Sequence, residues 1–84
     1  MKDLEELRGR IDKIDLRILD LLEKRWKIAK EIGEIKNKKG IDIYDPEREG
    51  GIVKTLTEKT RLDKNFVKKI FAGIMEYCRR GECE

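Results

Sequence analysis

The sequence contains no histidine, serine or glutamine, and these absences remove whole classes of chemistry. Serine nucleophiles, histidine-dependent triads and histidine metal sites are excluded, so any catalysis has to rest on Arg, Lys, Asp, Glu or Cys side chains. The two cysteines, Cys78 and Cys83, have no third thiol or imidazole to complete a metal site and are too few for a disulfide framework. We therefore interpret both as reduced thiols and expect no metal site.

Long apolar runs are also missing. No stretch is long enough to span a membrane, and residues 1–10 lack the apolar core of a signal peptide, so we expect a soluble, cytoplasmic protein. The formal net charge is +3, and both signs are interleaved along the chain, which gives no indication of nucleic-acid binding. With 84 residues, 46% of them charged, the chain has room for a single small domain with little core of its own.

A long apolar repeat is the main feature that the sequence does have. Its members recur at alternating three- and four-residue steps, and they are Leu4, Leu7, Ile11, Ile14, Ile18, Leu21, Arg25, Ile28, Ile32 and Ile35. This spacing predicts one helix over about residues 3–38, stopped by residues 37–40. At 1.5 Å per residue the helix is roughly 50 Å long, whereas a compact chain of this size is about 30 Å across. The helix therefore cannot bury its apolar stripe within one chain.

A second helix is predicted over about residues 46–59. Asp45 is suited to the N-cap position and Pro46 to the first helical position, which together form a strong helix start. Gly50 and Gly51 fall in the second turn and cost on the order of 2 kcal/mol relative to two alanines. Either the packing there is very close, or this helix is frail.

A third helix is predicted over about residues 63–81, with Asp63 as its cap and an end near Gly81. The residues expected to face a core are Phe66, Val67, Ile70, Phe71, Ile74 and Tyr77. The fold class is thus all-α, with three helices per chain and a long first helix, assembled as an intertwined helical homodimer. The alternative is a plain antiparallel coiled-coil adaptor.

Arg25 is the one charged member of the apolar repeat. An unpaired guanidinium at such a position costs several kcal/mol in desolvation, so an anionic group has to meet it. Lys36 lies eleven residues further on, nearly on the same helix face and roughly 16 Å along the axis, and the two cations could bracket a small dianion. The alternative is that Arg25 pairs with a carboxylate of another helix and fixes the register of association.

Further candidates lie near both ends of the chain and at the second helix. Arg8 is about 26 Å from Arg25 along one helix, so it could serve the same ligand only from the partner of an antiparallel dimer; otherwise it is a solvated charge. The guanidinium of Arg48 could bind a carboxylate with two hydrogen bonds, and Glu49 or exposed backbone N–H groups could bind a hydroxyl. The alternative is that the first turn of the second helix is ordinarily capped and contains an ion pair. Glu82 is one turn from the Cys78 thiol, or else a solvated side chain at a frayed terminus.

Two segments resemble a known family. Residues 25–36, RWKIAKEIGEIK, followed by residues 45–49, DPERE, are similar to the signature of the all-helical chorismate mutases. The similarity extends over nearly the whole chain. It implies a homodimer with two active sites that converts chorismate to prephenate for phenylalanine and tyrosine synthesis, without a cofactor or metal.

The resemblance also implies roles for the cationic residues. By position, Arg25 and Arg8 from the other chain would bind the side-chain carboxylate of chorismate, and Arg48 the ring carboxylate. Lys36 would donate a hydrogen bond to the ether oxygen. The rearrangement is pericyclic and needs neither a nucleophile nor proton transfer, so the lack of histidine and serine is no obstacle.

The remaining positions include two departures from the family pattern. Glu49 and the backbone near Asp45 would bind the ring hydroxyl. Cys78 stands where many relatives have a small polar residue that touches the ring carboxylate, and a thiol is a weaker donor. Glu82 stands where bacterial relatives often have glutamine, and a carboxyl group can donate to the ether oxygen only when protonated.

A catalytically silent regulatory or partner-binding helical module is the alternative function. A scaffold has no need for the five charged residues together, namely Arg8, Arg25, Lys36, Arg48 and Glu49. Their joint presence favours the enzyme.

Overall fold

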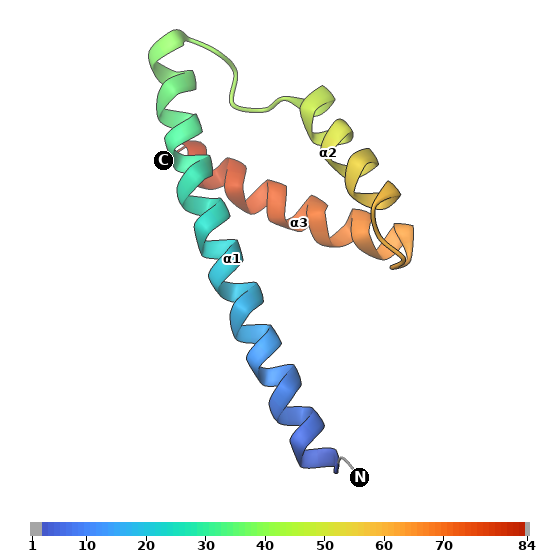
Figure 1. Ribbon diagram of the computed structural model, residues 1–84. Helices are drawn as coiled ribbons and strands as arrows, with labels where there is room; N and C mark the ends of the chain where they lie inside the picture. Colours follow the sequence, from blue (N-terminus) through green and yellow to red (C-terminus); the bar gives the residue numbers. More distant parts are fainter. Residues whose placement is uncertain (1–2, 84) are drawn as a thin grey trace.

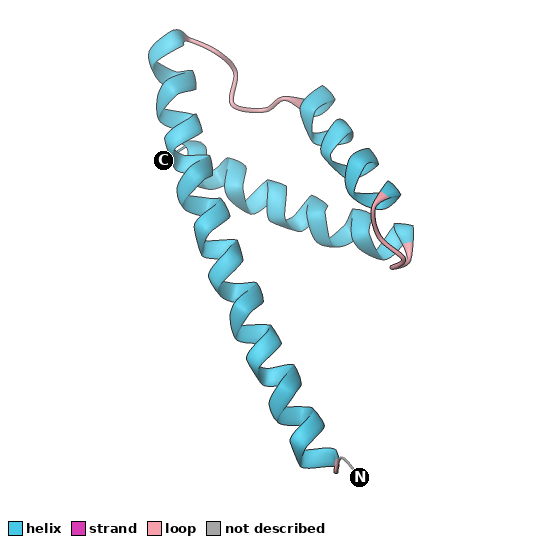
Figure 2. Cartoon of the chain, in the orientation of Figure 1, coloured by secondary structure: helices cyan, strands magenta, loops and turns pink. Residues whose placement is uncertain are grey.

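The computed structural model describes residues 3–83, except for the side chains of residues 82 and 83. They form three helices: α1, Leu4–Lys39; α2, Pro46–Glu58; and α3, Lys64–Cys83 (Figure 1). Only loops join the helices, and no strand occurs in the described part of the chain (Figure 2). The prediction of an all-α fold with a long first helix is confirmed. No helix among these residues combines the length and apolar character needed to cross a membrane.

Both ends of α1 are capped by local interactions. The Asp3 carboxylate accepts a hydrogen bond from the Glu6 backbone N–H at 2.8 Å, which satisfies one of the unpaired N–H groups of the first turn. At the other end, Gly40 adopts a left-handed conformation with φ 68°, and its N–H donates to the Asn37 carbonyl. Lys36, Lys38 and Lys39 place positive charge in the last turn, where the helix dipole favours it.

Aspartates also begin the two shorter helices. Asp45 accepts a hydrogen bond from the Arg48 backbone N–H at 3.0 Å, and Asp63 accepts one from that of Phe66 at 2.9 Å. Gly50 and Gly51 lie inside α2 without interrupting it. Apart from the adjacent backbone of α2 itself, no described atom lies within 4 Å of a Cβ added at either glycine, so close packing within this chain does not explain them.

The helix α3 continues to Cys83, two residues beyond the end predicted near Gly81. Gly81 is buried, and a Cβ added there would lie 2.5 Å from Nε1 of Trp26. The missing side chain lets α3 approach the indole on α1. This glycine therefore serves the packing of two helices and does not stop one.

The helices are arranged around α3, which packs against both α1 and α2. In the described chain the backbones of α1 and α2 do not approach each other closely. The N-terminal half of α1 projects well beyond the crossing with α3 (Figure 1). The molecule measures 58 × 24 × 15 Å, and its radius of gyration is 16.2 Å, against about 12 Å for a compact chain of this length.

Little of the apolar surface is buried by this arrangement. The buried apolar residues are Ala29, Val67, Met75 and Cys78. Three predicted core residues of α3 are exposed, namely Phe66 at 51%, Ile70 at 40% and Tyr77 at 56%. Within one chain α1 and α2 cover only one side of α3, whose apolar stripe is wider than that, and the prediction that these residues face a core of the homodimer stays a prediction.

Candidate active site

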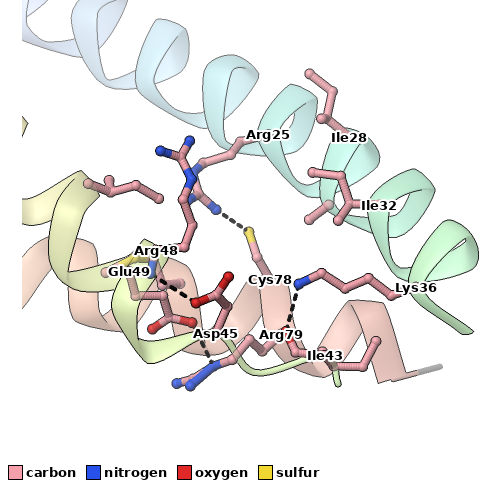
Figure 3. Close-up of a pocket in the computed structure, with 13 residues that line it drawn as sticks. Arg25, Ile28, Ile32, Lys36, Ile43, Asp45, Arg48, Glu49, Cys78 and Arg79 are labelled. Carbon is pink, nitrogen blue, oxygen red and sulfur yellow. Dashed lines mark hydrogen bonds and ion pairs between the residues drawn. The ribbon is translucent and has the colours of Figure 1, made fainter. Parts of the chain in front are cut away.

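A cavity of about 350 Å³ lies where the three helices meet (Figure 3). It brings together six of the eight predicted site residues, with side chains from α1, α2, α3 and the connection between α1 and α2. The lining residues are Arg25, Ile28, Ala29, Ile32, Lys36, Ile43, Asp45, Arg48, Glu49, Ile52, Met75, Cys78 and Arg79. Charged groups thus surround an apolar floor.

Arg25 enters the cavity from α1 and is half-buried. Its Nη1 donates a hydrogen bond to Sγ of Cys78 on α3 at 2.9 Å. A thiol sulfur is a weak acceptor and carries no formal charge, so it orients the guanidinium without neutralising it. Among the described residues Arg25 forms no ion pair, and the alternative of a carboxylate partner on another helix is not observed within this chain.

Lys36 lines the same cavity, nearer the C-terminal end of α1. Its Nζ donates a hydrogen bond to the Ile43 carbonyl at 2.8 Å, which fixes the ammonium against the connection between α1 and α2. An ammonium group has three donors, and the carbonyl takes one of them. Ile28 and Ile32 lie between Arg25 and Lys36 on this face of α1 and supply the apolar floor (Figure 3).

The first turn of α2 contributes three polar side chains. Asp45 lines the cavity and caps the helix at once. The backbone N–H groups of Arg48 and Glu49 both donate to Asp45, to its carboxylate and its carbonyl respectively, so neither is free for a hydroxyl. The Arg48 side chain is exposed, whereas that of Glu49 is mostly covered.

Arg79 is a lining residue that the sequence reasoning missed. Its Nε lies 3.3 Å from Oε2 of Glu49, and its guanidinium carbon lies 4.4 Å from the ring centroid of Tyr44. Met75, Cys78 and Arg79 occupy positions i, i+3 and i+4 of α3 and therefore share a face. The spacing could have indicated Arg79 as a site residue, because Cys78 was already a candidate for the site.

Two predicted site residues are not brought to the cavity by this chain. Arg8 is exposed in the N-terminal half of α1 and is not among the lining residues. The side chain of Glu82 lies outside the described residues.

The charges of the cavity define the kind of ligand that it suits. Among the described residues, its cationic side chains are Arg25, Lys36, Arg48 and Arg79, and its carboxylates are Asp45 and Glu49. An excess of two positive charges over an apolar floor matches a small, partly apolar dianion. The fold and site therefore define a small all-α protein with a predominantly cationic cavity built on three helices.

Comparison with known proteins identifies the family. The chain belongs to the family of chorismate mutase type II, whose family model matches residues 7–82. This membership confirms the resemblance seen in the sequence.

Individual relatives and a solved structure agree with that membership. A chorismate mutase of Methanocaldococcus jannaschii is 41% identical over 80 residues, covering 92% of this chain and 81% of the relative. A bifunctional chorismate mutase/prephenate dehydratase of Aquifex aeolicus is 46% identical over 71 residues, covering 84% of this chain and 19% of the relative. A solved structure of a conserved hypothetical protein from Pyrococcus furiosus matches with a TM-score of 0.80 and 35% identity, covering 94% and 93% of the two chains.

Proposed function

We propose that this protein is a chorismate mutase, an isomerase that rearranges chorismate to prephenate in aromatic amino acid biosynthesis. The observation that carries the proposal is the cavity with two excess positive charges over an apolar floor, in a chain of the chorismate mutase type II family. Chorismate carries one carboxylate on a largely apolar ring and a second on its enolpyruvyl side chain, and the cavity complements both properties. We place this activity in the cytoplasm.

The reaction requires restraint and charge stabilisation. The enolpyruvyl arm has to be held over the ring, and negative charge grows on the ether oxygen as the C–O bond stretches. Arg25 binds the side-chain carboxylate with guanidinium donors that the Cys78 contact leaves available. Arg48 binds the ring carboxylate at the entrance to the cavity.

Lys36 is the residue that acts on the breaking bond. It donates a hydrogen bond to the ether oxygen, while the Ile43 carbonyl holds its Nζ in place. A fixed ammonium needs no reorganisation when charge develops, which makes it more effective than water at that position. The support for this role is that Lys36 is half-buried and keeps two donors for a ligand.

Glu49 and Cys78 complete the proposed site within this chain. The Glu49 carboxylate accepts a hydrogen bond from the ring hydroxyl, next to Asp45. Cys78 orients Arg25 because its Sγ accepts from Nη1 of that residue, and its S–H remains a weak donor for the ring carboxylate.

A homodimer is part of the proposal. The apolar repeat remains largely uncovered in one chain, and Leu4, Ile11 and Ile14 are each more than half exposed. A second copy would bury this stripe, and an antiparallel arrangement of the two α1 helices would bring Arg8 of one chain toward the cavity of the other. We therefore propose that residues 1–84 form one domain of an intertwined dimer with two shared sites.

The direct test is the loss of the ultraviolet absorbance of chorismate when the purified protein is added, with prephenate identified as the product. We expect turnover that is abolished by Lys36→Ala, because the ether oxygen then loses its fixed donor. Lys39→Ala, in the same last turn of α1 but outside the cavity, is the matched control and should retain activity. Absence of turnover in the parent protein would favour the silent binding module instead.

A further inference from the structure

Arg79 makes two contacts that the proposed roles above do not use. It forms an ion pair from α3 to Glu49 on α2, and the two side chains are only 27% and 20% exposed. The other ion pair of the described chain, between Lys24 and Asp20, lies within α1 and is largely exposed. The Arg79 pair is thus the one that joins two helices, and it does so at the edge of the cavity.

The position of Glu49 creates an electrostatic conflict. Its carboxylate is suited to accept the ring hydroxyl, but it also lies in a cavity proposed to receive a ligand with two negative charges. A like charge in a partly buried site opposes binding, since solvent screening is weaker there than at an open surface. A cation paired with one oxygen of Glu49 offsets this repulsion and leaves the carboxylate able to accept a hydrogen bond.

Arg79 is also held from its other side. Its guanidinium carbon lies 4.4 Å from the centroid of the Tyr44 ring, within the range of a cation–π contact. Tyr44 immediately precedes Asp45, the N-cap of α2. Because the backbones of α1 and α2 do not approach each other in the described chain, the place of the α2 residues relative to Arg25 and Lys36 depends on α3 and on the connection that Lys36 holds through the Ile43 carbonyl. Arg79 fixes that relation next to the site.

We infer that Arg79 is a positioning residue that neutralises and orients Glu49, so that Glu49 can bind the ring hydroxyl without repelling the dianionic substrate. The inference rests on the proposed function. The ring hydroxyl is on the carbon next to the C–O bond that breaks but takes no part in the electron rearrangement, so we expect the contact to contribute similarly to the ground state and the transition state. Loss of Arg79 should therefore raise KM and leave kcat nearly unchanged.

The first comparison uses two neighbouring arginines. Arg79→Met keeps much of the aliphatic stem and removes the charge, and we expect it to raise KM for chorismate about fivefold to tenfold, with kcat within about twofold. Arg80→Met removes the same charge one residue away, outside the cavity, and should leave both constants unchanged. Arg79→Lys retains the charge and should recover most of the lost affinity. An equal response of both Met variants would overturn the inference.

A double-mutant cycle tests whether Arg79 acts through Glu49. In a Glu49→Gln background the repelling charge is gone, so Arg79→Met should change KM by less than about twofold. The same increase in KM in both backgrounds would show that Arg79 does not act through Glu49 and would overturn the inference. Far-UV circular dichroism establishes that each variant is folded, and if Arg79→Met is not, the cycle is measured with Arg79→Lys, whose smaller effect should also vanish with Glu49→Gln.

Measurements on the parent protein distinguish failure of this inference from failure of the proposed function. If it converts chorismate and Arg79→Met has the parental KM, the inference is wrong and the proposed function stands. If the parent neither binds nor converts chorismate, both are overturned.

Discussion

The contact between Gly81 and Trp26 predicts that one substitution has opposite effects at two helical glycines. Glycine to alanine within a helix stabilises it by about 1 kcal/mol, because alanine loses less backbone entropy. At Gly50 nothing described apart from the adjacent backbone of α2 lies within 4 Å of the added Cβ, so Gly50→Ala should gain that amount. At Gly81 the new Cβ would lie 2.5 Å from Nε1 of Trp26 and 3.2 Å from two further indole atoms.

At Gly81 the clash with Trp26 makes the same substitution destabilising. Forcing an extra methyl group into a closed contact costs typically about 1–3 kcal/mol, which equals or exceeds the helical gain. The indole is rigid, and Lys30 Nζ lies 4.6 Å from its ring centroid, so movement of the ring disturbs a further contact. The net effect of Gly81→Ala is a loss of up to about 2 kcal/mol, and the two variants should differ by about 1–3 kcal/mol.

Thermal unfolding followed by circular dichroism measures this difference. For a domain of this size each kcal/mol shifts Tm by about 4–8 °C, and all samples have to be compared at one protein concentration because association contributes to stability. Trp26 is the only tryptophan of the chain, so its fluorescence reports the displaced indole directly. We expect an emission shift in Gly81→Ala and none in Gly50→Ala.

A double-mutant cycle with a smaller residue in place of Trp26 isolates the contact between positions 26 and 81. In a Trp26→Leu background Gly81→Ala should no longer be destabilising, because the atoms it meets are absent. The reasoning is refuted if Gly81→Ala raises Tm as much as Gly50→Ala and leaves the emission unchanged, since α3 would then not approach the indole closely.

Three further predictions concern assembly and the site. Sedimentation at micromolar concentration should give twice the chain mass of 10.0 kDa, with a Tm that rises with concentration, whereas a well-folded monomer would argue against the dimer. Arg8→Ala and Arg25→Ala should each be nearly inactive, yet mixing them should restore about a quarter of the parental activity, because a mixed dimer has one intact site; no recovery despite proven subunit exchange would exclude the cross-chain role of Arg8. If Glu82 donates to the ether oxygen, kcat/KM should fall as pH rises and Glu82→Gln should flatten the profile, whereas superimposable profiles would remove Glu82 from the site.

The helices and much of the site could be predicted because they depend on local rules. Asp3, Asp45 and Asp63 each bond to a backbone N–H three residues away, so their capping is encoded within one turn. Arg25 and Lys36 share a face of α1 because eleven residues are close to three helical turns. The length of α1 also showed that one chain cannot cover its own apolar repeat.

Other features were decided by how the helices cross. Arg79 reaches Glu49 and Tyr44 only because α3 packs against α2 beside the connection that follows α1. The continuation of α3 through Gly81, against the helix-ending tendency of glycine, depends on an indole 55 positions earlier in the chain. Which side of the apolar stripe on α3 is buried likewise depends on the crossing with α1. Helix crossings are set by the fit of side chains from distant segments, which periodicity and capping do not specify.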